Sequence, residues 1–304
     1  MFPISNYFTG VNIGSVSVNL VITDDQMNIS TFKKAHLGRP KEVLDELLQE
    51  HVSERTDDNY FYEVSGSFGD LSEIVAVERA INSYDEQFEV VLSLGGEAIV
   101  LYVLDEQGHI LNVLSHDKCA AGSGEFFKQQ IDRLGLTLPE AIKLARKGKK
   151  IEISSRCSVH CKSDVTHKLN RGEASIEDLL HSVLASMVNK VIGLIIQSRV
   201  DVKRVLTIGG VTLNPVFINL LKEELHDVEV VVKDESAVFE AYGTALVAQD
   251  NPEKTTLQLK STKSFATHPT LKDFEKKVSI IKPKEYKKSF EKNADFILGV
   301  DVGS

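Results

Sequence analysis

Cysteine is scarce in this sequence, which contains three cysteines in 304 residues and no tryptophan. An odd number of cysteines argues against a disulfide framework and indicates free thiols or metal ligation. The first seven residues lack a basic region followed by an apolar core, so no secretory signal is predicted. The cytoplasm is therefore the expected compartment.

Long hydrophobic runs are also absent, since no 18 consecutive residues are apolar. The most apolar stretch, 179–200, is interrupted by polar side chains as a buried amphipathic helix would be, so no membrane span is expected. Acidic residues outnumber basic ones by 44 to 35, which argues against a nucleic-acid-binding surface. Residues 251–292 differ, with eleven lysines and five acids, and predict a surface linker; a polyanion-binding patch is the alternative.

One short phrase occurs twice in the chain. Residues 10–15 (GVNIGS) return as residues 299–304 (GVDVGS), which predicts that a second copy of the domain begins within 293–304. Asp301 in the later copy is a carboxylate able to hold a hydrated magnesium ion beside a phosphate, whereas the first copy has the amide Asn12. We therefore expect this copy to bind nucleotide and to hydrolyse it poorly.

Strand and helix patterns alternate in an order typical of a mixed α/β fold. Three β-type runs, 7–12, 17–23 and 27–32, predict an antiparallel meander, and a helix is expected after Pro40. A second unit of strand, glycine turn and strand starts near residue 89. The other segments predict strands at 60–64, 110–114, 202–208 and 228–232, and helices at 124–134, 138–147, 176–199, 215–225 and 237–248.

The chain is long enough, with 42% hydrophobic residues, for two lobes. We predict lobe I over residues 1–92, completed by the C-terminal helix 237–248, and lobe II over residues 93–236. Residues 251–292 are the lysine-rich linker, and residues 293–304 are the start of the truncated second copy. Each lobe is expected to contain a mixed sheet flanked by helices.

Three glycine turns stand where an apolar strand stops. Glycine lets backbone N–H groups approach a phosphate because no Cβ intervenes, but it is also the usual way to leave a strand, so one turn is a weak signal. Three turns predict that the first two clamp a polyphosphate from opposite lobes and that the third lies under a nucleoside. The residues concerned are Asn12, Gly14, Ser15, Gly95, Gly96, Gly209 and Gly210.

Two cysteine segments, 117–124 (DKCAAGSG) and 154–159 (SSRCSV), are the sharper signal. Cys119 precedes a predicted helix with a glycine-rich first turn, where free N–H groups and the helix dipole would favour a thiolate and an anionic cluster bound to it. For a single cysteine, a small buried core residue is the alternative.

Cys161 follows Cys157 by four residues, so both would share one face if the segment is helical. We interpret Cys161 as a buried bystander; a spare thiol near a cluster is the alternative. His160 and His167 could complete a zinc site with these cysteines, but the spacing matches no standard finger pattern.

Over roughly residues 8–248, these motifs resemble the activator ATPases of 2-hydroxyacyl-CoA dehydratases and the related ATP-binding subunits of benzoyl-CoA reductase. The family belongs to the wider group of actin, sugar kinases and heat-shock chaperone ATPases. The resemblance implies a two-lobed actin-like (ribonuclease H-like) fold with MgATP or MgADP between the lobes, and Asn214 keeps its adenosine-side pattern.

The resemblance also implies a 4Fe–4S cluster shared between two copies, with Cys119 and Cys157 as ligands. The second copy would come from the same chain or from a homodimer. ATP binding and hydrolysis would then gate transfer of a low-potential electron to an acyl-CoA dehydratase or reductase.

The sequence departs from the family at three positions. Asn12 and Ser93 stand where the family has Asp, and Glu97 replaces a Gln that would position the attacking water. Weak or magnesium-insensitive nucleotide binding is therefore expected. The competing hypothesis is a degenerate pseudo-ATPase copy that serves as scaffold or nucleotide sensor for the second copy; a small-molecule kinase would leave the cysteine segments unexplained.

Overall fold

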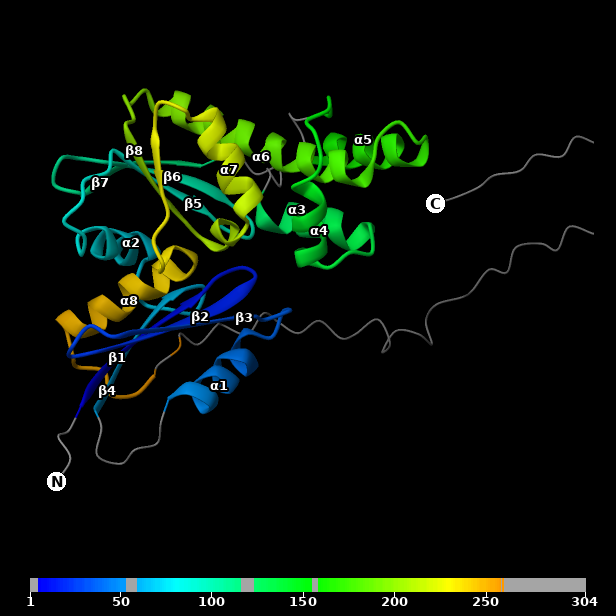
Figure 1. The fold of residues 1–304 in the computed structure, drawn as a ribbon. Coiled ribbons are helices and arrows are strands. Elements are labelled where there is room, and N and C mark those ends of the chain that lie inside the picture. Colours follow the sequence, from blue (N-terminus) through cyan, green and yellow to red (C-terminus); the bar gives the residue numbers. More distant parts are fainter. Residues whose placement is uncertain (1–4, 53–58, 116–122, 155–157, 258, 260–304) are drawn as a thin grey trace, which may run out of the picture. The chain divides into compact units, whose positions relative to one another are not determined.

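The computed structural model describes residues 5–52, 59–115, 123–154, 158–257 and 259. The chain divides into two compact units, Met1–Ser261 and Thr262–Ser304, and every described residue belongs to the first. Cys119, Cys157, most of the lysine-rich linker and the second-copy segment 293–304 therefore lie outside the described residues. The first unit contains two sheets with helices on their faces (Figure 1).

The first sheet has the strand order β3-β2-β1-β4. Strands β1 (Asn6–Ile13), β2 (Ser17–Asp24) and β3 (Ile29–Ala35) pair antiparallel, which confirms the predicted meander. Helix α1 (Pro40–His51) then crosses over, so that β4 (Asn59–Gly66) pairs parallel to β1. Proline in the first turn suits a helix start because its φ is already helical. The face of α1 that covers the sheet consists of Val43, Leu44 and Leu47.

The second sheet repeats this arrangement and adds one strand, in the order β7-β6-β5-β8-β9. Its strands are β5 (Val90–Leu94), β6 (Ile99–Leu104), β7 (Ile110–Ser115), β8 (Arg204–Ile208) and β9 (Glu229–Val231). Strands β5 to β7 are antiparallel neighbours, and β8 is parallel to β5 as β4 is to β1. Both sheets are mixed, and each opens with the predicted strand, glycine turn and strand.

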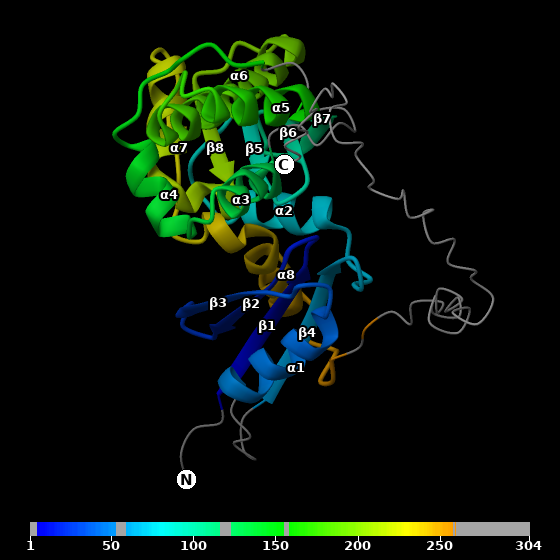
Figure 2. The same cartoon turned by 90° about the vertical axis from the view of Figure 1, so that its right-hand side faces the viewer.

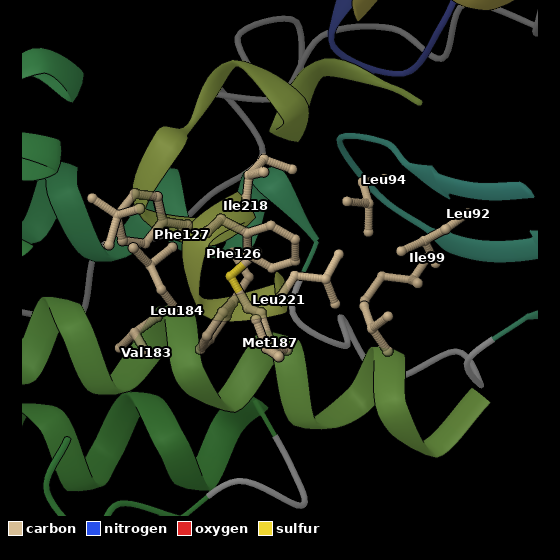
Figure 3. Packing of buried hydrophobic residues seen from close by; sticks show 14 of the residues in the cluster. Leu92, Leu94, Ile99, Phe126, Phe127, Val183, Leu184, Met187, Ile218 and Leu221 are labelled. Atoms are coloured by element: carbon tan, nitrogen blue, oxygen red, sulfur yellow. The ribbon is translucent and has the colours of Figure 1, made fainter. Parts of the chain in front are cut away.

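Five helices belong to the second sheet: α3 (Gly124–Arg133), α4 (Leu138–Ala145), α5 (Ser158–Asn170), α6 (Ile176–Ser198) and α7 (Pro215–Glu224). Apolar side chains from these helices and from one face of the sheet form a continuous core. Figure 3 shows Phe126 and Phe127 of α3 facing Val183, Leu184 and Met187 of α6.

Helix α6 is long and apolar enough to cross a membrane by length and composition alone. In the fold, however, 67% of its most apolar window is buried, and its side chains join the core of the second sheet. The expectation of a buried core helix is therefore confirmed.

Two central helices lie between the sheets, α2 (Glu73–Ile81) and α8 (Phe239–Asp250) (Figures 1 and 2). Side chains of α2, α8 and the inner face of the second sheet form one core cluster, and α8 also contacts β1 and β4 of the first sheet. Helix α2 was not predicted from the sequence. The last helix was predicted at 237–248, whereas Ser236–Val238 form a 3₁₀ turn before α8.

Candidate functional site

The first two glycine turns meet, although they come from different sheets. A Cβ atom placed on Gly96 would lie 2.4 Å from Val16 Cγ2 and 3.2 Å from Ser15 Oγ. Only glycine allows so close an approach at this position. The predicted juxtaposition of these turns is confirmed, and their contact with a polyphosphate stays a prediction.

Backbone N–H groups in these turns already have partners. Gly14 N–H donates to Ser17 O at 3.1 Å, and Gly95 N–H donates to Ala98 O at 3.0 Å, which closes the two hairpins. At the start of α3, Gly124 N–H donates to Gly95 O at 3.0 Å and Glu125 N–H donates to Gly96 O at 2.9 Å. The expectation that this helix start has free N–H groups is therefore wrong for these two residues, because the second turn caps them.

The third turn joins the same cluster. A Cβ on Gly124 would lie 3.1 Å from Val211 Cγ2, the residue after Gly209 and Gly210. Gly209 has a φ of 91°, and a Cβ there would lie 2.5 Å from Leu94 O, so this position requires glycine twice over. All three predicted turns thus lie at one place in the fold.

Asn214 has a structural role that was not predicted. Its Oδ1 accepts hydrogen bonds from Val216 N–H at 3.0 Å and Phe217 N–H at 3.3 Å, so it caps the start of α7. Glu97 is exposed in the second turn.

Asn12 and Ser93 occupy equivalent places near the ends of β1 and β5, on the strand faces turned toward the central helices. Asn12 Nδ2 donates to Glu73 Oε1 at 2.9 Å and to Ser65 Oγ at 3.1 Å. Ser93 Oγ donates to Glu240 Oε1 at 3.3 Å. Asn12 and Ser93, the two positions without the expected carboxylate, therefore each contact a carboxyl group from the first turn of a central helix, α2 or α8.

The charges at this place are mixed. Burial raises the pKa of Glu240, the nearby Glu73 adds to that rise, and Lys33 and Ser93 oppose it. Lys33 Nζ donates to Ala237 O at 3.0 Å. Loss of water around its ammonium group lowers the pKa of Lys33, against the attraction of Glu240.

Lys33 also reaches the third turn, because its Nζ lies 2.7 Å from where a Cβ on Gly210 would be. One ammonium group and two carboxyl groups, from Lys33, Glu73 and Glu240, thus lie beside the strand ends and turns that meet here. None of these three residues was predicted from the sequence. The only local signal of Glu73 and Glu240 is an acid in the first turn of a helix, which helices favour generally, and Lys33 lies in strand β3.

The cysteine side of the site is described only in part. Cys161 is buried, as predicted, and burial raises the pKa of its thiol despite a hydrogen bond with Ser186 and the charge of Lys190. The buried Lys190 ammonium also lies 5.7 Å from the ring centroid of Phe126. The first turns of α3 and α5, which follow the two cysteine segments, therefore both face Lys190 of α6.

A zinc site has no support among the residues that the structure describes, which contain no group of three or more His, Cys, Asp or Glu side chains able to hold a metal ion. His160 is exposed whereas Cys161 is buried, so the side chains of these two neighbours are not placed to bind the same metal ion.

Comparison with known sequences identifies similar proteins. A sequence model described as the BadF/BadG/BcrA/BcrD ATPase family matches residues 47–248. The 2-hydroxyisocaproyl-CoA dehydratase activator of Clostridioides difficile is 27% identical over 269 residues, which cover 84% of this chain and 99% of the relative. The (R)-2-hydroxyglutaryl-CoA dehydratase activating ATPase of Acidaminococcus fermentans is 28% identical, with 82% and 100% covered.

Solved structures give the same result. The activator of the 2-hydroxyisocaproyl-CoA dehydratase from Clostridium difficile with bound ADPNP superimposes with a TM-score of 0.71 and 26% identity. The match covers 91% of this chain and all of that one. The actin-like fold of two lobes is thereby confirmed.

Proposed function

Because the chain belongs to the BadF/BadG/BcrA/BcrD ATPase family, we propose that it is a nucleotide-binding activator domain for an acyl-CoA dehydratase or reductase. The observation that carries this proposal is the meeting of three glycine turns from two sheets at Gly96, Gly124 and Val211. A ligand bound there would contact both lobes at once, so its phosphate state would bias their relative position. Relatives named as activators, one of them with bound ADPNP, support the same role.

The electron-transfer part of the proposal concerns the two cysteine segments. Cys119 and Cys157 would hold a 4Fe–4S cluster, which when bound supplies one-electron transfer at low potential. The described surroundings fit such a group, because the first turns of α3 and α5 converge on the buried cation Lys190. A buried ammonium group favours negative charge nearby.

The assembly and location follow as further parts of this proposal. The lobes would extend over residues 1–92 with helix 237–248, and over 93–236, joined by the linker 251–292 to a second copy from 293 onward. Cysteines of that copy, or of a homodimer partner, would complete the cluster. The cytoplasm is the proposed compartment, since low-potential clusters need reducing conditions.

A second candidate function is favoured by one observation. Asn12 and Ser93 lack the carboxylates of the family, and their hydrogen bonds are already made within the protein. A copy that binds nucleotide without hydrolysing it would serve as a scaffold or sensor for the second copy. Glu97, exposed in the second turn, is the proposed catalytic group only for a copy that hydrolyses nucleotide.

Iron and acid-labile sulfide analysis of anaerobically prepared protein tests the cluster. We expect about four irons per pair of copies, lost in the Cys119→Ala/Cys157→Ala double variant. Cys161→Ala is the matched control and should keep its iron, because Cys161 is buried in the core of the second sheet. Folded wild-type protein without iron would favour the scaffold or sensor role, provided that the intact tandem chain is also free of iron.

A further inference from the structure

Glu240 of α8 contacts strand β5 near the end of that strand. Its Oε1 accepts a hydrogen bond from Ser93 Oγ at 3.3 Å, so its carboxylate lies directly beside the side chain of that strand. Glu73 is placed in the same way by Asn12 of β1, at 2.9 Å. Burial raises the pKa of Glu240, and the negative charge of Glu73 adds to that rise.

In the part of the chain that the structure describes, no cationic side chain forms an ion pair with Glu73 or Glu240. Among the described residues, the ion pairs within 4 Å do not include Lys33 either. Lys33 instead donates to the carbonyl of Ala237 and stands beside Gly210. Two carboxyl groups and one separate ammonium group thus lie beside the place where the three glycine turns meet.

This charge distribution matches a metal-bound polyphosphate. Mg²⁺ keeps several of its waters and is usually held by one or two carboxylates together with substrate phosphates. It therefore does not need the larger group of ligands that the described residues lack. An ammonium group set apart from the carboxylates is suited to a phosphate oxygen.

We propose that Glu240, with Glu73 beside it, holds hydrated Mg²⁺ of the bound nucleotide in place of the carboxylate absent at Ser93, and that Lys33 contacts a nucleotide phosphate. This inference rests on the proposed function, because it presupposes that nucleotide binds where the three glycine turns meet. Asn12 and Ser93 predict weak or magnesium-insensitive nucleotide binding. The proposal instead makes nucleotide binding in this copy dependent on magnesium, because helices α2 and α8 supply the carboxyl groups that the strands lack.

A simpler explanation of Glu73 and Glu240 is that acids in the first turn of a helix are favoured by the helix dipole. That explanation predicts an effect of substitution on stability and none on the response to magnesium. Titration calorimetry of the full chain with ADP, in the presence and absence of MgCl₂, separates the two.

For the wild type we expect MgCl₂ to strengthen ADP binding. Glu240→Gln keeps the size of the side chain and its hydrogen-bonding oxygen. In this variant about 10- to 100-fold more MgCl₂ should be needed for the same strengthening of ADP binding, as for other outer groups of a metal site. The exposed Glu253→Gln is the matched control and should respond as the wild type does.

Lys33→Met should weaken ADP binding by about tenfold or more both with and without magnesium, because a charge-assisted hydrogen bond to phosphate is lost. Lys34→Met is its matched control, since the neighbouring Lys34 points to α1 and pairs with Glu46 at 2.8 Å. Thermal unfolding of each variant checks that it is folded.

A rescue variant makes the test specific to the missing carboxylate. Ser93→Asp in the Glu240→Gln background restores a carboxylate at the end of β5 and should recover the response to magnesium. An unchanged response in Glu240→Gln would overturn the inference while leaving nucleotide binding intact. Wild-type protein that binds no ADP under either condition would overturn the proposed function as well.

Discussion

At the scale of single residues, Cys161 is a buried thiol whose neighbours oppose the effect of burial on its pKa. Removal from water raises the pKa of the thiol, whereas a hydrogen bond with Ser186 and the charge of Lys190 lower it. Burial is the largest of these effects, so the thiol remains neutral near pH 8. Because thiolates are the reactive form, Cys161 should be inert in the folded protein.

Alkylation by iodoacetamide at pH 8 tests this in a Cys119→Ser/Cys157→Ser background, where Cys161 is the remaining thiol. We expect alkylation in the folded state to be far slower than in concentrated urea, because access and ionisation are both restricted. Since the pKa is raised, the folded-state rate should still be climbing above pH 9. Equal rates in buffer and urea would show that Cys161 is accessible.

The turn glycines were predictable from the sequence, and the charged groups between them were not. Gly95 and Gly209 end apolar strands, which is a local pattern. Glu240 is 147 residues away from Ser93 along the chain, and their contact exists because α8 packs across the inner face of the second sheet. A single sequence contains no local pattern for such a contact. The cap at Asn214 differs, because an Asn before Pro215 is a local signal for a helix start.

At the scale of elements, two glycines permit the central layer. A Cβ on Gly243 of α8 would lie 1.8 Å from Ala76 O of α2, and a Cβ on Gly10 of β1 would lie 2.2 Å from Ala241 O of α8. Both distances are far shorter than any van der Waals contact, and the opposing atoms are backbone. The close packing predicted from Gly243 is confirmed, and it fixes how α8 sits against its neighbours.

Gly243→Ala should therefore destabilise the protein by about 1–3 kcal/mol or more, because α2 and α8 must move apart. Gly193→Ala is the matched control in α6, where a Cβ would meet nothing within 4 Å. That control should be stabilising by up to about 1 kcal/mol, since alanine is the better helix former. Urea denaturation of both variants measures the difference, and equal effects would refute the packing argument.

Helix α2 was missed because its signal is short. It has nine residues, follows the glycine-containing segment 65–69, and exposes Ile74 and Val75, which blurs its apolar face. Its buried side, Ala76, Val77, Ala80 and Ile81, becomes recognisable once α8 is in place against it. The longer elements were predictable because their periodicity extends over more turns.

At the scale of the whole unit, the central layer couples the two sheets. Phe239 and Tyr242 of α8 pack with Val91 and Leu206 of the second sheet, while the same helix contacts β1 of the first sheet at Gly10. Neither sheet can lose this layer without exposing apolar surface of the other. The unit Met1–Ser261 should therefore unfold cooperatively, although it contains two sheets.

Differential scanning calorimetry of the full chain tests this coupling together with nucleotide binding. We expect one main transition, because α8 is shared between the sheets. A ligand that binds only the folded state at 100 times its Kd adds about 2.7 kcal/mol, so ADP with MgCl₂ should raise the midpoint by about 5–10 °C. ADP without magnesium should raise it less if Glu240 has the proposed role. Two transitions would instead show that the sheets unfold separately. If ADP then raised the midpoint of only one transition, the ligand would contact a single lobe.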